Sequence, residues 1–102
     1  MNRYIIAPSA SRDLNEIIDY FARLNVETGE RLIAAFEKKC QNLINFPMIG
    51  RSYEEIRPDL RGVPLDGYII LYQVTANTLE ILRVVHGSRN LKALFESDEE
   101  EI

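Results

Sequence analysis

The stretch from Gly67 to His86 reads GYIILYQVTANTLEILRVVH and contains two runs rich in β-branched and aromatic residues. Ala76 and Asn77 stand between the runs, and asparagine tolerates the positive φ angles that a two-residue hairpin turn requires. Two such runs joined by a short turn are typical of a β-hairpin. We therefore expect this hairpin to form the centre of a sheet.

Two segments upstream of the hairpin show helical periodicity. Ser9 is placed to cap the first helix and Asn25 to cap the second, which has to end before Pro47. The apolar residues of the first stripe are Leu14, Ile17, Ile18 and Phe21, and those of the second are Leu32, Ile33, Phe36, Cys40, Leu43 and Ile44. Because almost nothing separates the two segments, we expect an antiparallel helical hairpin.

The remaining segments complete an α+β architecture in one domain. Residues 3–7 form a short β-favouring run, and residues 47–66 read as a loop with one short strand at residues 60–63. Residues 91–96 have the composition for one or two helical turns. The predicted order is therefore β-α-α-β-β-β, with the helical hairpin packed on a small, mainly antiparallel sheet.

Both faces of the predicted β-hairpin are apolar. Alternation places Tyr68, Ile70, Tyr72 and Val74 on one face of the first strand, and Ile69, Leu71, Gln73 and Thr75 on the other. The second strand divides into Leu79, Ile81, Arg83 and Val85 against Glu80, Leu82, Val84 and His86. The helical hairpin can cover only one face. Residues 46–60 with the last helix, or alternatively a partner chain, have to cover the second.

The charge of the chain is concentrated at its end. The 102 residues carry a net charge of −4, but five of the sixteen acids lie in residues 96–102, which we interpret as an acidic tail after a single domain of residues 1–95. The rest of the chain has 12 basic and 11 acidic residues, so its net charge is too small to attract a nucleic acid strongly. We therefore expect no direct nucleic-acid binding.

Cysteine usage and hydropathy indicate a cytoplasmic protein. The one cysteine, Cys40, cannot form an internal disulfide and lies on a helical apolar stripe, where a buried small side chain is expected. The longest apolar run, YIILYQV, is far shorter than the roughly 18 residues of a membrane span. One cysteine and one histidine do not build a zinc site, so we expect no metal and no cofactor.

The segment RVVHGSRN, Arg83 to Asn90, places two arginines and the only histidine where a strand gives way to a turn. Three interpretations compete: a nucleolytic site, a surface that grips another macromolecule, and a strand end pinned by hydrogen bonds. Strand parity sends Arg83 and His86 to opposite faces, which disfavours a convergent catalytic site. Arg83 is equally consistent with an internal ion pair to an acid such as Glu80 or Asp19.

Five short sequence motifs, taken in order, resemble those of the ParE toxins of the RelE/ParE superfamily. They are AxxDLxEIxDYF (residues 10–21), LxxFPxxGR (43–51), RPxLRG (57–62), GYIILYQV (67–74) and RVVHGSRN (83–90). The resemblance implies a RelE/ParE-like fold and the toxin of a type II toxin-antitoxin system. It implies further that the toxin inhibits DNA gyrase, arrests growth, stabilises a plasmid and is neutralised by a ParD-like antitoxin.

The resemblance also leaves two alternatives: a RelE-like nuclease that cuts messenger RNA on the ribosome, and an inactive relative that only binds an antitoxin. The expected target-binding residues are Arg61, Arg83, His86 and Arg89, and the same four would carry catalysis in a nuclease. The expected antitoxin-binding residues are Leu14, Ile18, Phe36 and Tyr72. Because lysines are scarce and HGSRN resembles the ParE form, we favour a protein-binding toxin without catalytic residues.

Overall fold

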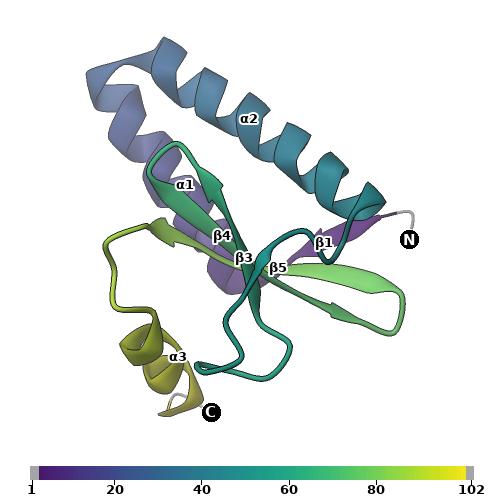
Figure 1. Cartoon of the computed structure of the whole chain (residues 1–102). Coiled ribbons are helices and arrows are strands. Elements are labelled where there is room, and N and C mark those ends of the chain that lie inside the picture. The colour runs from purple at the N-terminus through teal and green to yellow at the C-terminus, as the bar shows by residue number, and fades with distance from the viewer. Residues whose placement is uncertain (1–2, 101–102) are drawn as a thin grey trace.

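The computed structural model describes residues 3–100, and the side chains of residues 3–96. Its elements follow in the order β1 (Tyr4–Ile6), α1 (Pro8–Leu24), α2 (Val26–Asn45), β2 (Arg51–Ser52), β3 (Arg61–Leu65), β4 (Tyr68–Thr75), β5 (Thr78–His86) and α3 (Leu91–Glu100). The five strands form one mixed sheet in the order β1-β5-β4-β3-β2, in which only the β1–β5 pair is parallel. The predicted α+β class is confirmed (Figure 1).

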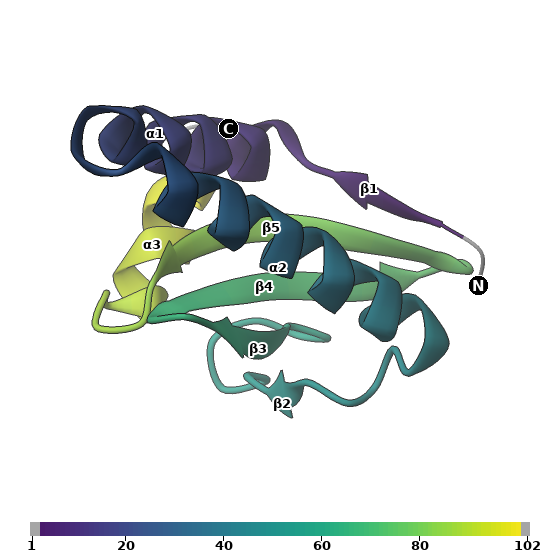
Figure 2. The same ribbon diagram turned by 90° about the horizontal axis from the view of Figure 1, so that it is seen from above.

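The helices α1 and α2 form the predicted antiparallel hairpin across one face of the sheet (Figure 2). Asn25 caps α2 as expected, because its side-chain oxygen accepts a hydrogen bond from the Thr28 amide at 3.2 Å. The prediction for α1 was wrong: the cap is Ala7, with Pro8 in the first turn, so Ser9 lies inside the helix. Proline suits this position because its fixed φ is helical and its missing N–H would have had no partner.

The β4–β5 hairpin turns at Ala76 and Asn77, whose φ angles of 43° and 66° confirm the predicted turn. A β-bulge then interrupts the alternation: Tyr72 pairs with Ile81, but Leu71 pairs with Arg83, which leaves Leu82 as an extra residue. The bulge corrects the predicted faces of β5, because it places Val84 in the core beneath the helical hairpin. Val85 joins the opposite face instead.

Both faces of the sheet are covered by the chain itself. The first core lies beneath α1 and α2 and includes Phe36, Cys40 and Tyr72, all less than 4% exposed. The second core lies on the other face, where residues 53–60 and α3 pack on the sheet through Tyr53, Leu60, Leu71, Val85, Leu94 and Phe95. The intramolecular alternative for the second face is therefore confirmed, and no partner chain is needed to cover it.

Smaller differences from the expected boundaries have local causes. The predicted strand at residues 60–63 is observed at Arg61–Leu65, and it includes Pro64, which lies beyond the two-residue pairing with β2. The helix α3 runs to Glu100, so part of the predicted acidic tail has a helical backbone. Residues 101–102 lie outside the described residues. Within residues 3–100, no helix combines the length and hydropathy of a membrane span.

Candidate functional site

The end of β5 is tied to α1 by a buried ion pair. The Arg83 guanidinium donates two hydrogen bonds to the Asp13 carboxylate, at 2.8 and 3.0 Å, and the Val84 amide donates a third at 2.9 Å. The side chains of Arg83 and Asp13 are only 12% and 10% exposed. Since β1 ends at Ile6, opposite Ile81, the Asp13 carboxylate takes the place of a neighbouring strand beyond that point. The predicted internal ion pair exists, but its acid is Asp13.

The two acids named as examples, Glu80 and Asp19, are not the partners of Arg83. Glu80 instead accepts a hydrogen bond from Gln73 across the hairpin at 2.9 Å, and Asp19 lies on the exposed face of α1. Sequence analysis missed Asp13 because an acid in the first two turns of a helix is also explained by the helix dipole.

His86 and Arg89 lie together at the exposed end of β5. The Arg89 amide donates to the His86 carbonyl at 3.0 Å, and the His86 Nδ1 lies 2.9 Å from the Ser88 hydroxyl. The His86 ring contacts Tyr68 edge to face, with 5.7 Å between centroids. Both residues line a groove between α1 and the sheet, whose lining is Asp13, Glu16, Ile17, Tyr20, Tyr68, Val84, Val85, His86 and Arg89. The groove is therefore mixed in charge and partly aromatic.

Arg61 is separated from this groove. It pairs with Tyr72 across β3–β4, whereas His86 pairs with Tyr68, so the two positions differ by about 13 Å along β4. The Arg61 guanidinium donates to the carbonyls of Met48 and Gly50, at 3.2 and 2.7 Å, and so points into the loop that follows α2. The four predicted target-binding residues do not converge on one point.

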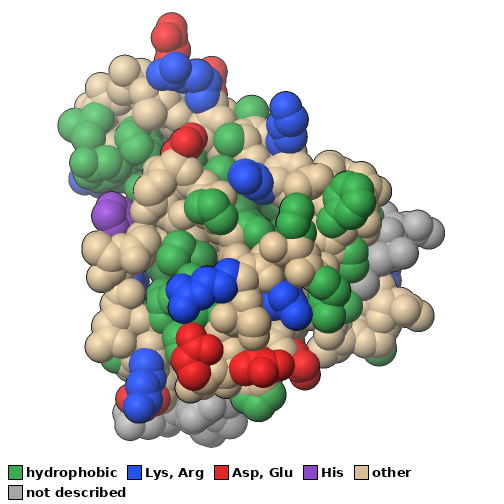
Figure 3. Space-filling model, viewed as in Figure 1, with side chains coloured by type: hydrophobic (Ala, Val, Ile, Leu, Met, Phe, Trp, Pro, Cys, Tyr) green, Lys and Arg blue, Asp and Glu red, His purple; other side chains and the backbone are tan. Residues whose placement is uncertain are grey.

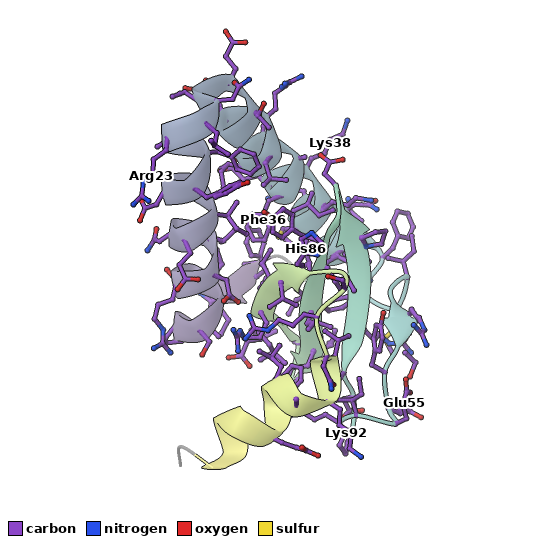
Figure 4. All side chains as sticks on the ribbon, turned by 90° about the vertical axis from the view of Figure 1, so that its left-hand side faces the viewer. Arg23, Phe36, Lys38, Glu55, His86 and Lys92 are labelled. Atoms are coloured by element: carbon purple, nitrogen blue, oxygen red, sulfur yellow. The ribbon has the colours of Figure 1, made fainter. Side chains whose placement is uncertain are left out.

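Two of the four predicted antitoxin contacts are in the core. Phe36 is 3% exposed and Tyr72 has no exposed surface, because both belong to the core between the helical hairpin and the sheet. Figure 4 shows Phe36 in this position. A side chain without exposed surface cannot touch a partner while the core stays folded, so both leave the proposed surface. Leu14 is half-buried, and Ile18 is 42% exposed on α1.

Two groups of exposed apolar side chains were missed from the sequence. One lies at the closed end of the helical hairpin and contains Tyr20, Leu24 and Val26, which are 57–65% exposed. The other lies in the loop after α2 and contains Phe46, Met48 and Ile49, which are 59–64% exposed. A signal for the loop was present: FPMIG places apolar residues around a proline, where neither a helix nor a strand can bury them.

Cys40 is a buried structural residue, as predicted. Burial is the main cause that raises the pKa of its thiol to about 12, and the nearby Glu37 carboxylate adds to the shift. A thiol with so high a pKa is protonated at neutral pH and is a poor nucleophile. Among the described residues, no group of three or more potential metal ligands is brought together.

Comparison with known proteins identifies the family of this chain. Residues 4–91 match the family model described as the ParE toxin of the type II toxin-antitoxin system parDE. This chain belongs to the ParE toxin family. It is 31% identical over 87 residues to Toxin ParE1 of Mycobacterium tuberculosis, which covers 83% of this chain and 89% of the relative. It is 29% identical over 94 residues to Toxin ParE3 of Caulobacter vibrioides, with 91% and 94% covered.

Two solved structures share the fold of this ParE-family chain. A chain of the chromosomal ParDE toxin-antitoxin system from P. aeruginosa superposes with a TM-score of 0.71 at 21% identity, covering 84% of this chain and 96% of that one. The isolated E. coli RelE toxin superposes with a TM-score of 0.58 at 17% identity, covering 97% and 98%. The chain is thus a toxin of the type II toxin-antitoxin class with a RelE/ParE fold.

Proposed function

We propose that this ParE-family toxin inhibits DNA gyrase by protein–protein binding and is neutralised in the cytoplasm by a cognate ParD-like antitoxin. The observation that carries the proposal is the separation of its cationic groups. Arg83 is held by Asp13, Arg61 points into a loop, and only Arg89 lies beside His86 at the strand end. Cleavage of RNA requires an acid, a base and cations that meet at one phosphate, and such a cluster is not assembled from these residues.

The proposed target contact is the exposed end of β5. His86 and Arg89 present an imidazole and a guanidinium there, and Arg83 supports them from behind by fixing β5 to α1. An exposed guanidinium forms bidentate bonds with carboxylates of a protein partner. Arg61 contributes to the proposed target surface only indirectly, because its hydrogen bonds hold the loop that follows α2 in place.

The proposed antitoxin contact is the outer side of α1. Ile18 is 42% exposed on this helix, and the half-buried Leu14 lies one turn before it. Apolar surface gains about 25 cal/mol for each Å² that a partner covers, so a helix or extended segment laid along α1 binds mainly by burial. Such binding depends weakly on salt. The ParDE system from P. aeruginosa, a structural neighbour, supports an antitoxin partner.

A RelE-like nuclease is the second candidate, and one observation favours it. The groove beside His86 also contains Arg89, Tyr20 and Tyr68, which are side chains that can bind and protonate a phosphate ester. The two functions separate in paired assays on the purified toxin: DNA supercoiling by gyrase, and cleavage of a message on ribosomes.

We expect loss of supercoiling without message cleavage. Cleavage that disappears in a folded His86→Ala variant would instead establish the nuclease. In bacteria, induction of the toxin alone should arrest growth, and co-expression of the antitoxin encoded beside it should restore growth. Normal growth with soluble toxin would favour an inactive relative that only binds an antitoxin.

A further inference from the structure

The turn that joins β3 to β4 contains the dipeptide Asp66-Gly67. Among the asparagines and aspartates of the chain, Asp66 is the only one that a glycine follows. An aspartate side chain can react with the backbone nitrogen of the next residue, and glycine has no side chain that hinders the approach. The product of that reaction is a five-membered cyclic imide, a succinimide. The turn is therefore a candidate site of covalent modification.

Both reacting groups are accessible in the folded protein. Asp66 and Gly67 are exposed, and the Asp66 carboxylate forms no hydrogen bond or ion pair with any residue that the structure describes. Within the same residues, nothing accepts a hydrogen bond from the Gly67 N–H. A Cβ placed on Gly67 would have no atom within 4 Å, so the space around this glycine is open. Asp19 differs, because it lies inside α1, where the following N–H is bonded along the helix.

The turn depends on the backbone conformation of these two residues. Leu65 pairs with Tyr68, so Asp66 and Gly67 alone close the β3–β4 hairpin. Their φ angles are 44° and 87°, both in the left-handed region that a two-residue hairpin turn requires. A longer main chain between the paired residues does not fit this geometry.

The modification takes two steps and needs only water. The Gly67 nitrogen attacks the Asp66 Cγ, a C–N bond forms, and the carboxyl hydroxyl leaves with the amide proton as one water molecule. Water then opens the ring at one of its two carbonyl carbons. Opening at the Asp66 backbone carbonyl breaks its bond to the Gly67 nitrogen, so the main chain now runs through the side chain. This product is isoaspartate, which has the composition of aspartate and one more methylene in the main chain.

The turn also holds the end of β5. The Gly67 carbonyl accepts a hydrogen bond from the Gly87 amide at 2.8 Å, and Tyr68 pairs with His86. The turn and the end of β5 therefore lie at the same end of the sheet (Figure 2). Figure 3 shows the histidine of the chain at the surface. A displaced Gly67 carbonyl loosens the backbone that carries His86 and Arg89.

From these observations we infer that Asp66-Gly67 is a site of spontaneous isoaspartate formation in the folded toxin, and that the product loosens the end of β5. The inference goes beyond the proposed function, because it assigns a modification to the chain and not a binding partner. Its chemistry requires no enzyme. An enzyme that methylates exposed isoaspartate takes the product as a substrate, and such an enzyme serves as a probe for it.

The test follows full-length toxin kept at neutral pH for several weeks. Isoaspartate is counted by methylation with an isoaspartyl methyltransferase and located by mass spectrometry of the digested protein. We expect at least tenfold more isoaspartate at Asp66 than at Asp19. Asp66→Glu keeps the charge but would need a six-membered ring, which forms far more slowly, so the signal should disappear. Asp66→Asn forms the same succinimide by losing ammonia, and isoaspartate should accumulate several-fold faster.

Hydrogen exchange tests the structural consequence. The Gly87 amide should exchange faster in aged wild-type toxin than in aged Asp66→Glu, because only the wild type gains the extra methylene. Equal exchange would show that the Gly67 carbonyl keeps its place, which overturns the second half of the inference.

Two results would overturn the first half. One is isoaspartate at Asp66 no more frequent than at Asp19. The other is isoaspartate at Asp66 that forms only in urea, which would show that the folded turn protects the dipeptide. None of these measurements involves gyrase or an antitoxin, so failure of the proposed function leaves the inference standing.

Discussion

The turn after β5 and the loop after α2 handle their polar groups in opposite ways. In the turn, residues 86–90, the backbone is closed by local bonds and the side chains of His86 and Arg89 face solvent. In the loop, residues 46–50, the backbone is closed by Arg61 and Tyr72 from the sheet, and the side chains that face solvent are apolar. An arginine near a loop is therefore not by itself a residue that contacts a partner protein. Its guanidinium can instead donate hydrogen bonds to backbone carbonyls of the loop that have no other partner.

Arg83 teaches the same lesson in the core. It sits three residues before His86 in one cationic segment, yet its guanidinium is satisfied by Asp13 on α1. Of the four predicted target-binding residues, two thus hold backbone segments in place and two remain open to solvent. Substitutions can test this distinction between side chains that hold the backbone and side chains that are exposed. Their effects on the free energy of unfolding should fall in a definite order.

The largest effect is expected for Asp13→Ala. The substitution leaves the Arg83 guanidinium nearly buried without its anion and removes the bond to the Val84 amide. Removal of one member of a buried pair typically costs about 3–5 kcal/mol of unfolding free energy. Urea denaturation should show this loss, whereas Asp19→Ala on the exposed face of the same helix should change stability by less than about 0.5 kcal/mol. Equal effects would mean that the pair does not anchor β5.

A smaller effect is expected for Tyr72→Phe, which keeps the ring and removes the hydroxyl. The Gly50 amide and the Pro47 carbonyl then lose their partner, and an unsatisfied buried polar group costs about 1–3 kcal/mol. Hydrogen exchange at Gly50 should accelerate more than exchange in β5. Tyr20→Phe on the exposed part of α1 is the matched control and should leave both exchange and stability unchanged. Protection of Gly50 in Tyr72→Phe would show that Arg61 alone holds the loop.

The regular elements were predictable from the sequence because their signals are local. The Ala76-Asn77 turn and the Asn25 cap follow from residue types at fixed positions, and the helical hairpin follows from apolar periodicity. The bulge at Leu82 was not predictable, since it depends on how the paired strands β4 and β5 pack against the two cores. Because the bulge was missed, strict alternation assigned Val84 and Val85 to the wrong faces of the sheet.

The site was less predictable, because it depends on contacts between distant residues. Asp13 and Arg83 are 70 positions apart, and Tyr72 and Pro47 are 25 apart. The alternation on β4 correctly grouped Tyr72 with Ile70, but it could not tell that the helices bury both side chains completely. Phe36 was misjudged for the same reason.

Alkaline pH should weaken the contacts that hold the loop after α2. Burial raises the pKa of Tyr72 above its ordinary value of 10.0, while the bond from Gly50 and the charge of Arg61 oppose that rise. The folded state therefore keeps a proton that the unfolded state releases, so the contribution of Tyr72 to stability is complete below pH 10 and falls as the pH rises through the folded pKa. Urea midpoints from pH 8 to 11 should decline less steeply in Tyr72→Phe. Cys40 adds a similar decline up to about pH 12, present in both proteins. Parallel curves would contradict a titrating anchor.

The smallest effect on stability is expected at the exposed end of β5, where Arg89→Ala removes a solvated side chain. Exposed substitutions change the unfolding free energy by less than about 0.5 kcal/mol. The proposed inhibition of gyrase should nevertheless weaken several-fold, because an exposed guanidinium aids recognition of an acidic partner. This contribution should shrink as salt rises, since a Debye length of about 8 Å at physiological ionic strength screens exposed charges. Supercoiling assays at 50 and 200 mM salt check both points, with Lys92→Ala on α3 as the matched cation. If Arg89→Ala destabilised the fold as Asp13→Ala is expected to, the turn after β5 would prove to be an anchor like the loop after α2, and the contrast between the two regions would disappear.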